Sequence, residues 1–409
     1  MKGGRRGIAI VWVSIAIVVM LSLVGLALDT GYAVLVGNQL QNGADAAALA
    51  GAQTVATDQA TARARASTAG AANSAAGSSL TFDQNTDVEV GYFHPSTKVF
   101  TASGVLPNAV RAHARRTGTA HGAVPLLFGA AYGSPTMDMT RDAVASINVS
   151  VSPALLVMDP TGEYALDLTG SARIRVPNGG VLVNSSHPNG TRLGGSSILD
   201  TPALAITTSS IPDISHLTGQ LATNRAPQSD PMAWLPEPTP GPAVETNKVV
   251  VGTGNTRTLE PGYYPGGINV RGTLVMNPGI YILDDDFEAN SQASVTGNGV
   301  MIFLRGSANM GFNSDGMTLL LNPPTSGLYQ GVTIFQQRGN TAASSLPVSG
   351  TAIPNGTIYI PSAQLNITSS GGSGGVKLLV WRLNVSGSGT LTITGQNQIS
   401  TTGNPFLVE

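Results

Sequence analysis

The sequence predicts a mainly β protein that begins with one transmembrane helix, and three observations support this prediction. Residues 8–28 form an uncharged and almost entirely aliphatic run. After residue 151, short aliphatic segments recur about every twenty residues, separated by Gly, Asn and Ser, a period typical of stacked β coils. Glycine supplies 50 of the 409 residues, which suits frequent turns, and 42% of residues are hydrophobic, which is sufficient for a buried core.

The composition excludes several classes of function. Only 11% of residues are charged, against roughly 25% in typical soluble proteins, and the formal net charge is −2. This balance gives no clustered basic surface, so we expect no nucleic-acid partner. The chain contains no cysteine, which excludes disulfides, thiolate metal sites and cysteine nucleophiles.

The first predicted element is a transmembrane and extended helix over residues 1–56. Three cations precede its apolar span at residues 8–28, namely Lys2, Arg5 and Arg6. A span of this length covers a hydrocarbon core of ~30 Å. The positive-inside rule then places the N-terminus in the cytoplasm and exports the rest of the chain. A cleaved signal peptide, with its junction near residues 25–27, is the alternative.

The helical pattern continues beyond the apolar span, because an alanine-rich stretch follows it. Small residues on this outer part let a neighbouring backbone approach closely. We expect them to pack against a partner helix, through self-association or another protein, or against the protein's own globular domain. These residues are Ala44, Ala47, Ala48 and Gly51.

Residues 57–79 are rich in Ala, Ser and Gly, and we expect a stalk there, with a fraying continuation of the helix as the alternative. Residues 80–152 contain short alternating segments and one compact apolar patch, which predict a small α/β domain. The segment 109–116 carries several basic side chains that we expect on the solvent face of one strand, a basic patch for anions being the alternative. They are Arg111, His113, Arg115 and Arg116.

Residues 153–409 are predicted to form a right-handed parallel β-helix, with a β-sandwich as the alternative. The proline-rich segment 227–242 should be a linker or a strap. If the coils stack in register, one aliphatic set should point into a shared core. Its expected members are Ile280, Ile282, Val300, Ile302, Ile334 and Ile358.

Two N-terminal motifs carry a resemblance to a known family. Residues 28–32 read Leu-Asp-Thr-Gly-Tyr, and residues 38–52 read Asn-Gln-Leu-Gln-Asn-Gly-Ala-Asp-Ala-Ala-Ala-Leu-Ala-Gly-Ala. With the apolar span before them, they resemble the N-terminal module of TadE/TadG-like proteins of the tight-adherence (Flp) pilus assembly systems of bacteria. Residues 109–116 and 124–129 are similar to the TadG-like middle region, and the Pro-Gly-Tyr coils at 259–282 to its C-terminal region.

The resemblance implies a pilin-like N-terminal helix and a structural role in the assembly, anchoring or tip of a pilus or other adhesive surface structure. It implies other envelope or pilus-assembly proteins as partners. It also implies a location in the bacterial cell envelope, with a single-pass inner-membrane anchor and the bulk of the chain periplasmic or surface-exposed. Prepilins carry a glutamate at the fifth position of the apolar segment, where this chain has Trp12. An anchored accessory protein is therefore expected.

The sequence predicts no enzyme, no catalytic residues, no cofactor and no metal site, and residues 284–286 are expected to form an exposed acidic turn. The candidates for a Ca²⁺ site are three adjacent carboxylates, Asp284, Asp285 and Asp286, because carboxylate oxygens are ligands that this ion prefers. The alternative function is a membrane-tethered, carbohydrate-active β-helix, a polysaccharide lyase or hydrolase. That function would require convergence of a few charged side chains in one groove. They are Asp284, Asp286, Arg305 and Asp315.

Overall fold

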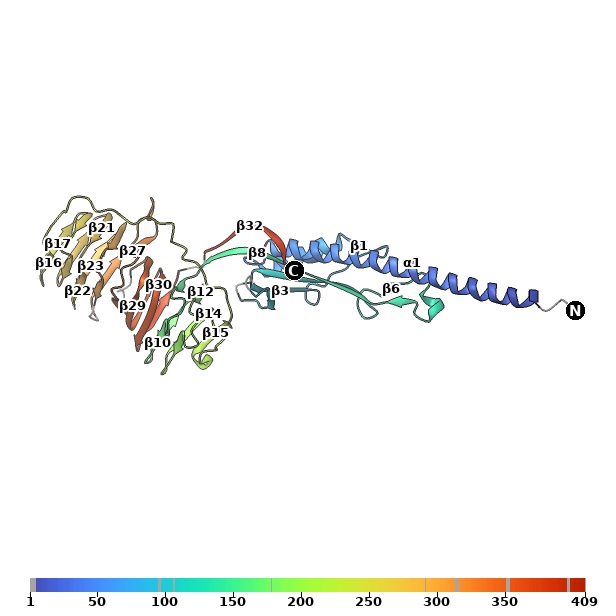
Figure 1. The fold of residues 1–409 in the computed structure, drawn as a ribbon. Coiled ribbons are helices and arrows are strands. Elements are labelled where there is room, and N and C mark those ends of the chain that lie inside the picture. The colour runs from blue at the N-terminus through green and yellow to red at the C-terminus, as the bar shows by residue number, and fades with distance from the viewer. Residues whose placement is uncertain are drawn as a thin grey trace. The chain divides into compact units, whose positions relative to one another are not determined.

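The computed structural model shows a mainly β chain with two α-helices among the residues that it describes (Figure 1). These residues are 5–94, 97–105, 107–177, 179–290, 292–312, 316–350, 354–395 and 398–408. The chain divides into two compact units, residues 1–149 with 401–409 and residues 150–400.

Helix α1, Arg5–Ala52, dominates the first unit. Its 48 residues correspond to a length of about 72 Å at 1.5 Å per residue. The apolar side chains of its first half are mostly exposed, whereas a stripe in its second half is fully buried. That stripe has the helical spacing of three to four residues and consists of Val36, Leu40, Ala44, Ala47, Ala48 and Ala52.

The buried stripe of α1 packs against a second helix and a sheet. Helix α2, Gln59–Ala71, contributes Ala62 and Ala66 to the same core. The sheet has the order β32-β8-β5-β3-β4 and is antiparallel between β8, β5, β3 and β4. Its strands are β3 Val88–His94, β4 Val99–Ala102, β5 Ala109–Arg116, β8 Met139–Ser152 and β32 Gln398–Val408.

Two short hairpins complete the first unit. One is formed by β1, Ser74–Ala75, and β2, Ser78–Ser79. The other is formed by β6, Val124–Pro125, and β7, Thr136–Met137, with the 3-10 turn η1, Gly129–Tyr132, between its strands.

The stalk predicted at residues 57–79 is wrong, because α2 and the first hairpin occupy this segment. The side chain of Asp58 begins α2 by accepting hydrogen bonds from the N–H groups of Ala60 and Thr61. The small residues that suggested flexibility instead permit close packing. A Cβ atom on Gly70 would lie 2.4 Å from the ring of Phe82, so the ring rests directly on the helix backbone.

The second unit is a β-solenoid of about 10 turns, which confirms the predicted β-helix. Each turn contributes strands to three parallel rows. The first row contains β18 Gly262–Tyr264, β21 Gly279–Leu283, β24 Val300–Leu304, β27 Val332–Gln336, β9 Leu155–Val157 and β12 Gly180–Val183.

The second row contains β16 Val249–Val251, β19 Ile268–Val270, β22 Phe287–Ala289, β25 Met310–Phe312, β28 Ser344–Gly350, β10 Leu166–Leu168 and β13 Thr191–Leu193. The third contains β17 Thr256–Leu259, β20 Thr273–Met276, β23 Ser294–Gly297 and β26 Thr318–Leu321, which form a four-stranded sheet of their own, and then β31 Thr390–Ile393 and β11 Arg173–Arg175. Besides β28, whose last residues pair with the third-row part of β29, four strands extend over two or three rows: β14 Ile198–Ile206, β15 Leu217–Ala222, β29 Gly356–Gly374 and β30 Val376–Gly387.

The turns do not stack in the order of the chain. Strand β9 of the first turn pairs on one side with β12 of the next turn and on the other with β30 near the C-terminus. A hydrogen bond of 2.5 Å from Arg382 Nε to Asp159 Oδ2 also joins the turn of β30 to the turn of β9. The first turn therefore lies inside the stack, between turns that are early and late in the sequence.

This order requires the chain to cross the solenoid once. It reaches one end of the stack at β15 and begins again at the other end with β16. The connecting residues 223–248, which we call the strap, contain no strand and run along the solenoid between β15 and β16 (Figure 1). At one end of the strap the amide of Asn184 exchanges hydrogen bonds with the backbone of Gln228, and at the other Val244 N donates to Tyr263 O.

The inner core differs at one turn from the set expected. Val300, Ile302, Ile334 and Ile358 are buried in it, but in β21 the inward residue is Tyr281, which pairs with Ile302. The expectation for Ile280 and Ile282 is wrong because side chains alternate between the two faces of a strand, so both neighbours of Tyr281 point away from the core. The Tyr281 hydroxyl donates to the carbonyl groups of Leu259 and Asn277, at 2.8 Å each, so this polar atom is satisfied.

The strap covers a second apolar layer on the outer side of the first strand row. Seven side chains of this layer lie in register and are at most 8% exposed: Ile282, Phe303, Phe335, Tyr359, Leu379, Leu156 and Leu182. The Tyr359 hydroxyl donates to Asp230 of the strap at 2.6 Å, and Arg338 donates to the carbonyl of Met232 at 2.7 Å. We call these seven residues the outer column.

Candidate functional site

The acidic turn at residues 284–286 lies between β21 and β22, and its three carboxylates contact different partners. Asp284 accepts a hydrogen bond of 2.7 Å from the Tyr263 hydroxyl and lies 3.6 Å from Arg305 Nη1. Asp285 lies 3.9 Å from Lys248 Nζ. The hydrogen bond to Asp284 also raises the pKa of the Tyr263 hydroxyl above its ordinary value.

Asp286 is directed to a third partner, since its Oδ1 accepts from the backbone and side-chain amides of Asn309 at 3.0 and 2.8 Å. The structure thus brings together Asp284 and Arg305 of the charged residues named for a carbohydrate-active groove. Asp315 lies outside the described residues. Across the described ranges, no group of three or more His, Cys, Asp or Glu side chains is arranged to hold a metal ion.

Because these carboxylates already have cationic or amide partners, we expect millimolar Ca²⁺ to leave the melting temperature unchanged. Asp285→Asn should change the free energy of unfolding by less than about 0.5 kcal/mol, since the side chain is exposed. Thermal unfolding followed by circular dichroism tests both. A melting temperature that rises with Ca²⁺, and no longer does so in the Asp284→Asn, Asp286→Asn double variant, would show a cation site.

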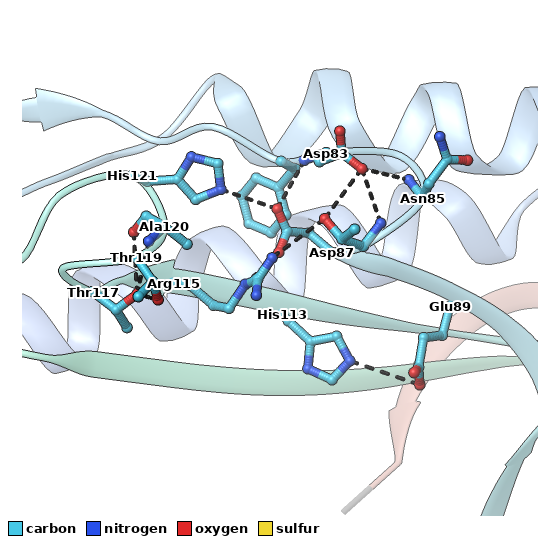
Figure 2. Close-up of polar contacts among 12 residues, drawn as sticks. Asp83, Asn85, Asp87, Glu89, His113, Arg115, Thr117, Thr119, Ala120 and His121 are labelled. Atoms are coloured by element: carbon cyan, nitrogen blue, oxygen red, sulfur yellow. Dashed lines mark hydrogen bonds and ion pairs between the residues drawn. The ribbon is translucent and has the colours of Figure 1, made fainter.

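A buried polar cluster in the first unit is centred on Asp87 (Figure 2). Its carboxylate accepts a hydrogen bond of 2.5 Å from Arg115 Nε and lies 3.1 Å from His121 Nε2. It also accepts a hydrogen bond of 2.9 Å from the backbone N–H of Asp83. Hydrogen bonds from the backbone N–H groups of Asn85 and Thr86 hold the pKa of Asp83 below its usual value.

The basic side chains of β5 are balanced by acids of the neighbouring strands. Arg111 and His113 lie 3.4 and 3.7 Å from Glu89 of β3, and His113 Nδ1 lies 2.7 Å from Asp142 of β8. Together with the Arg115–Asp87 pair, these contacts neutralise one face of the sheet. This arrangement does not favour the anion-binding alternative.

Arg116 departs from the expected solvent face, because it is buried. Its guanidinium donates to the carbonyl groups of Ala75 and Gly122, at 2.9 Å each. It therefore ties the first hairpin to the loop before β6. No sequence pattern indicates this contact or the cluster around Asp87, because the partners come from segments far apart in the chain.

Asp87→Ala should lower the free energy of unfolding of the first unit by about 3 kcal/mol. The change leaves Arg115, His121 and one backbone N–H without their acceptor in a buried site. Asp142→Ala is the matched control, because the Asp142 side chain is 60% exposed. This substitution should lower the free energy of unfolding by less than about 1 kcal/mol. Urea denaturation compares the two, and equal losses would contradict the role assigned to Asp87.

The third candidate is α1 itself. Within the described residues, Ala9–Ala52 is the one helical stretch whose length and apolar composition suffice to cross a bilayer. The small-residue face of its second half is already occupied by the protein's own domain. A Cβ atom on Gly51 would lie 3.1 Å from Ala66 Cβ and from Val110 Cγ1. Of the two packing partners expected for this face, the structure shows the protein's own domain.

Comparisons with known proteins concern this first unit. Residues 7–54 match a family described as "Tad: Putative Flp pilus-assembly TadE/G-like", and residues 46–145 match "Tad_C: Putative Tad-like Flp pilus-assembly". These matches confirm the resemblance to TadE/TadG-like proteins across residues 7–145. The resemblance drawn from the Pro-Gly-Tyr coils lies outside both ranges and stays a prediction.

No curated protein matches the chain. Among solved structures, the chain is similar to an ice binding protein from an Antarctic Biological Consortium at 16% identity. The match covers 58% of this chain and 92% of that one, with a TM-score of 0.20. A likeness at this level supports no statement about function.

Proposed function

We propose that the chain is a membrane-anchored structural protein of a Flp-type pilus system, with its N-terminus in the cytoplasm and its two folded units outside the inner membrane. It would serve the assembly, anchoring or tip of the pilus or of a related adhesive structure. One observation carries the proposal. A single uninterrupted helix, α1, has an exposed apolar half and a half that forms the core of the Tad-type unit.

The continuity of α1 favours an uncleaved anchor. Removal of the helix near residues 25–27 would leave Asp29 at the new N-terminus, although this carboxylate is only 7% exposed and accepts hydrogen bonds from the backbone of Leu127 and Phe128. Most of the apolar side chains before it are exposed. Their exposure suits a lipid environment, in which aliphatic side chains need no protein partner.

The proposed role is not enzymatic. The family matches point to pilus assembly, and three of the charged residues considered for carbohydrate chemistry, Asp284, Asp286 and Arg305, are engaged in local contacts. The solenoid alone does not specify an activity, since a fold can support many functions. Its regular stack supplies a compact unit of 251 residues, from 150 to 400, which suits a structural part of a surface assembly.

A topology experiment tests the anchor. A periplasm-active reporter fused after Glu409 should be active, and the protein should remain in the membrane fraction after an alkaline carbonate wash. Sequencing of the mature N-terminus should find a residue before the apolar span. A mature chain that begins near Leu28 and washes off the membrane would contradict the anchor.

A second experiment tests the assignment to the pilus. In a strain that makes Flp-type pili, deletion of the gene should reduce piliation or adhesion, and the full-length chain should restore it. Cross-linking followed by purification should recover pilus-assembly components with the protein. Normal pili and normal adhesion in the deletion strain would contradict the proposed role.

A further inference from the structure

The hairpin formed by β6 and β7 follows α1 toward its apolar half (Figure 1). Two sets of contacts mark its path. Asp29 accepts hydrogen bonds from the N–H groups of Leu127 and Phe128. Farther along, the Tyr132 hydroxyl donates to the carbonyl of Ser22. We call residues 126–133 the hairpin tip.

The hairpin tip lies beside residues that belong to the predicted span. Ser22 precedes Asp29 by seven residues, or about 10 Å along the helix axis. Close packing in this stretch depends on Gly25, because a Cβ atom there would lie 3.2 Å from the Phe128 side chain and 3.3 Å from the Tyr132 hydroxyl. A span that ends near residue 28 therefore brings the hairpin tip to the depth of its last two turns.

The surface of the hairpin tip is apolar and unusually exposed. Leu127 is 64% exposed, Phe128 44% and Tyr132 50%. Residues 122–137 contain no charged side chain. An exposed cluster of this kind, with a tyrosine hydroxyl as its polar handle, is typical of the boundary between lipid headgroups and acyl chains.

The backbone of the hairpin tip also suits a poorly hydrated environment. Five of its N–H groups have acceptors in the protein, those of Leu126, Leu127, Phe128, Ala131 and Gly133. Two of these acceptors are oxygens of Asp29, the first charged residue after the span. The pairing lowers the cost of placing both the loop and this carboxylate near the hydrocarbon core, where an unpaired polar group is expensive.

From these contacts we infer that the hairpin tip inserts into the outer headgroup region of the membrane that α1 crosses. It forms a second lipid contact beside the helix. The occupant of the surface is the lipid bilayer, because the surface continues the exposed apolar face of α1. Two contacts on one rigid unit fix both the depth and the rotation of α1, which a lone helix leaves free. The inference rests on the proposed membrane anchor.

The absence of cysteine from the sequence makes a direct test simple. Single variants Leu127→Cys, Leu21→Cys and Val99→Cys are labelled with an environment-sensitive fluorophore in the full-length protein, reconstituted into phosphatidylcholine liposomes. All three positions are exposed, so the label has room. Leu21 reports on the span, and Val99 on β4 serves as the matched aqueous control.

The label at Leu127 should be shielded from aqueous iodide several-fold better than the label at Val99. Lipids with a quencher near the headgroup should quench it, whereas the label at Leu21 should respond to quenchers deeper in the bilayer. If the label at position 21 is in lipid but the label at position 127 is in water, the inference is wrong and the anchor stands. If both labels are in water, the anchor is wrong as well. Shielding of Leu127 without lipid quenching would indicate a second copy of the chain on this surface and would also overturn the inference.

Discussion

Ile302→Asp is expected to unfold the solenoid, with a loss of more than about 4 kcal/mol in the free energy of unfolding. Ile302 is fully buried in the inner core, with Tyr281 and Ile334 on the adjacent turns in register with it. A carboxylate there has no ion partner, and the closed stack gives it no path to water, so the charge must be buried or neutralised. Urea denaturation followed by tryptophan fluorescence measures the loss.

Leu320→Asp is the matched control, because it makes a similar change on β26 at a side chain that is 44% exposed. It should alter the free energy of unfolding by less than about 1 kcal/mol. If both variants lose stability equally, the assignment of inward and outward faces in the solenoid is wrong.

Phe335→Ala is expected to lower the free energy of unfolding by about 3–5 kcal/mol and to loosen the strap. The Phe335 ring lies 5.0 Å from the Phe303 ring and 4.9 Å from the Tyr359 ring, measured between centroids, in the outer column. Its removal leaves a cavity under the strap that close-packed neighbours fill only in part. Limited proteolysis should then cut residues 223–248 earlier than in the wild-type chain.

The control for the strap is Val250→Ala, which trims an exposed side chain on β16. It should change neither the cleavage pattern nor the stability. An intact strap in the Phe335→Ala variant, with wild-type stability, would show that the outer column does not hold it.

The solenoid could be predicted from its repeat, but its second apolar layer was missed. Residues 300–304 read Val-Met-Ile-Phe-Leu, and all five are buried. Such uninterrupted runs are typical of strands that are covered on both faces, whereas a strand with one solvent-exposed face alternates between hydrophobic and polar residues. The expectation for Ile280 and Ile282 failed for the same reason, because in a strand that is apolar on both faces hydrophobicity alone does not tell which residues face inward.

Other features lie beyond what local sequence determines. The order of the turns depends on pairing between strands such as β9 and β30, whose sequences resemble those of many other turns. The Asp87 cluster joins side chains about thirty residues apart, which no periodicity reveals. The predicted stalk failed for a different reason, since alanine and glycine favour both flexible segments and very close helix packing.

The interior position of the first turn determines when the solenoid can be finished. A chain leaves the ribosome with its N-terminus first, so the strands β9, β10 and β11 exist long before β30 and β31, which must pair with them. Until residues 376–393 arrive, one side of the first turn is an open row of backbone donors and acceptors. Such an edge readily pairs with other chains, and closing contacts between residues so distant in sequence slows folding. The unfinished chain is therefore most prone to aggregation before its last turn has been synthesised. A chaperone that covers the open strand edge during this interval would protect the chain.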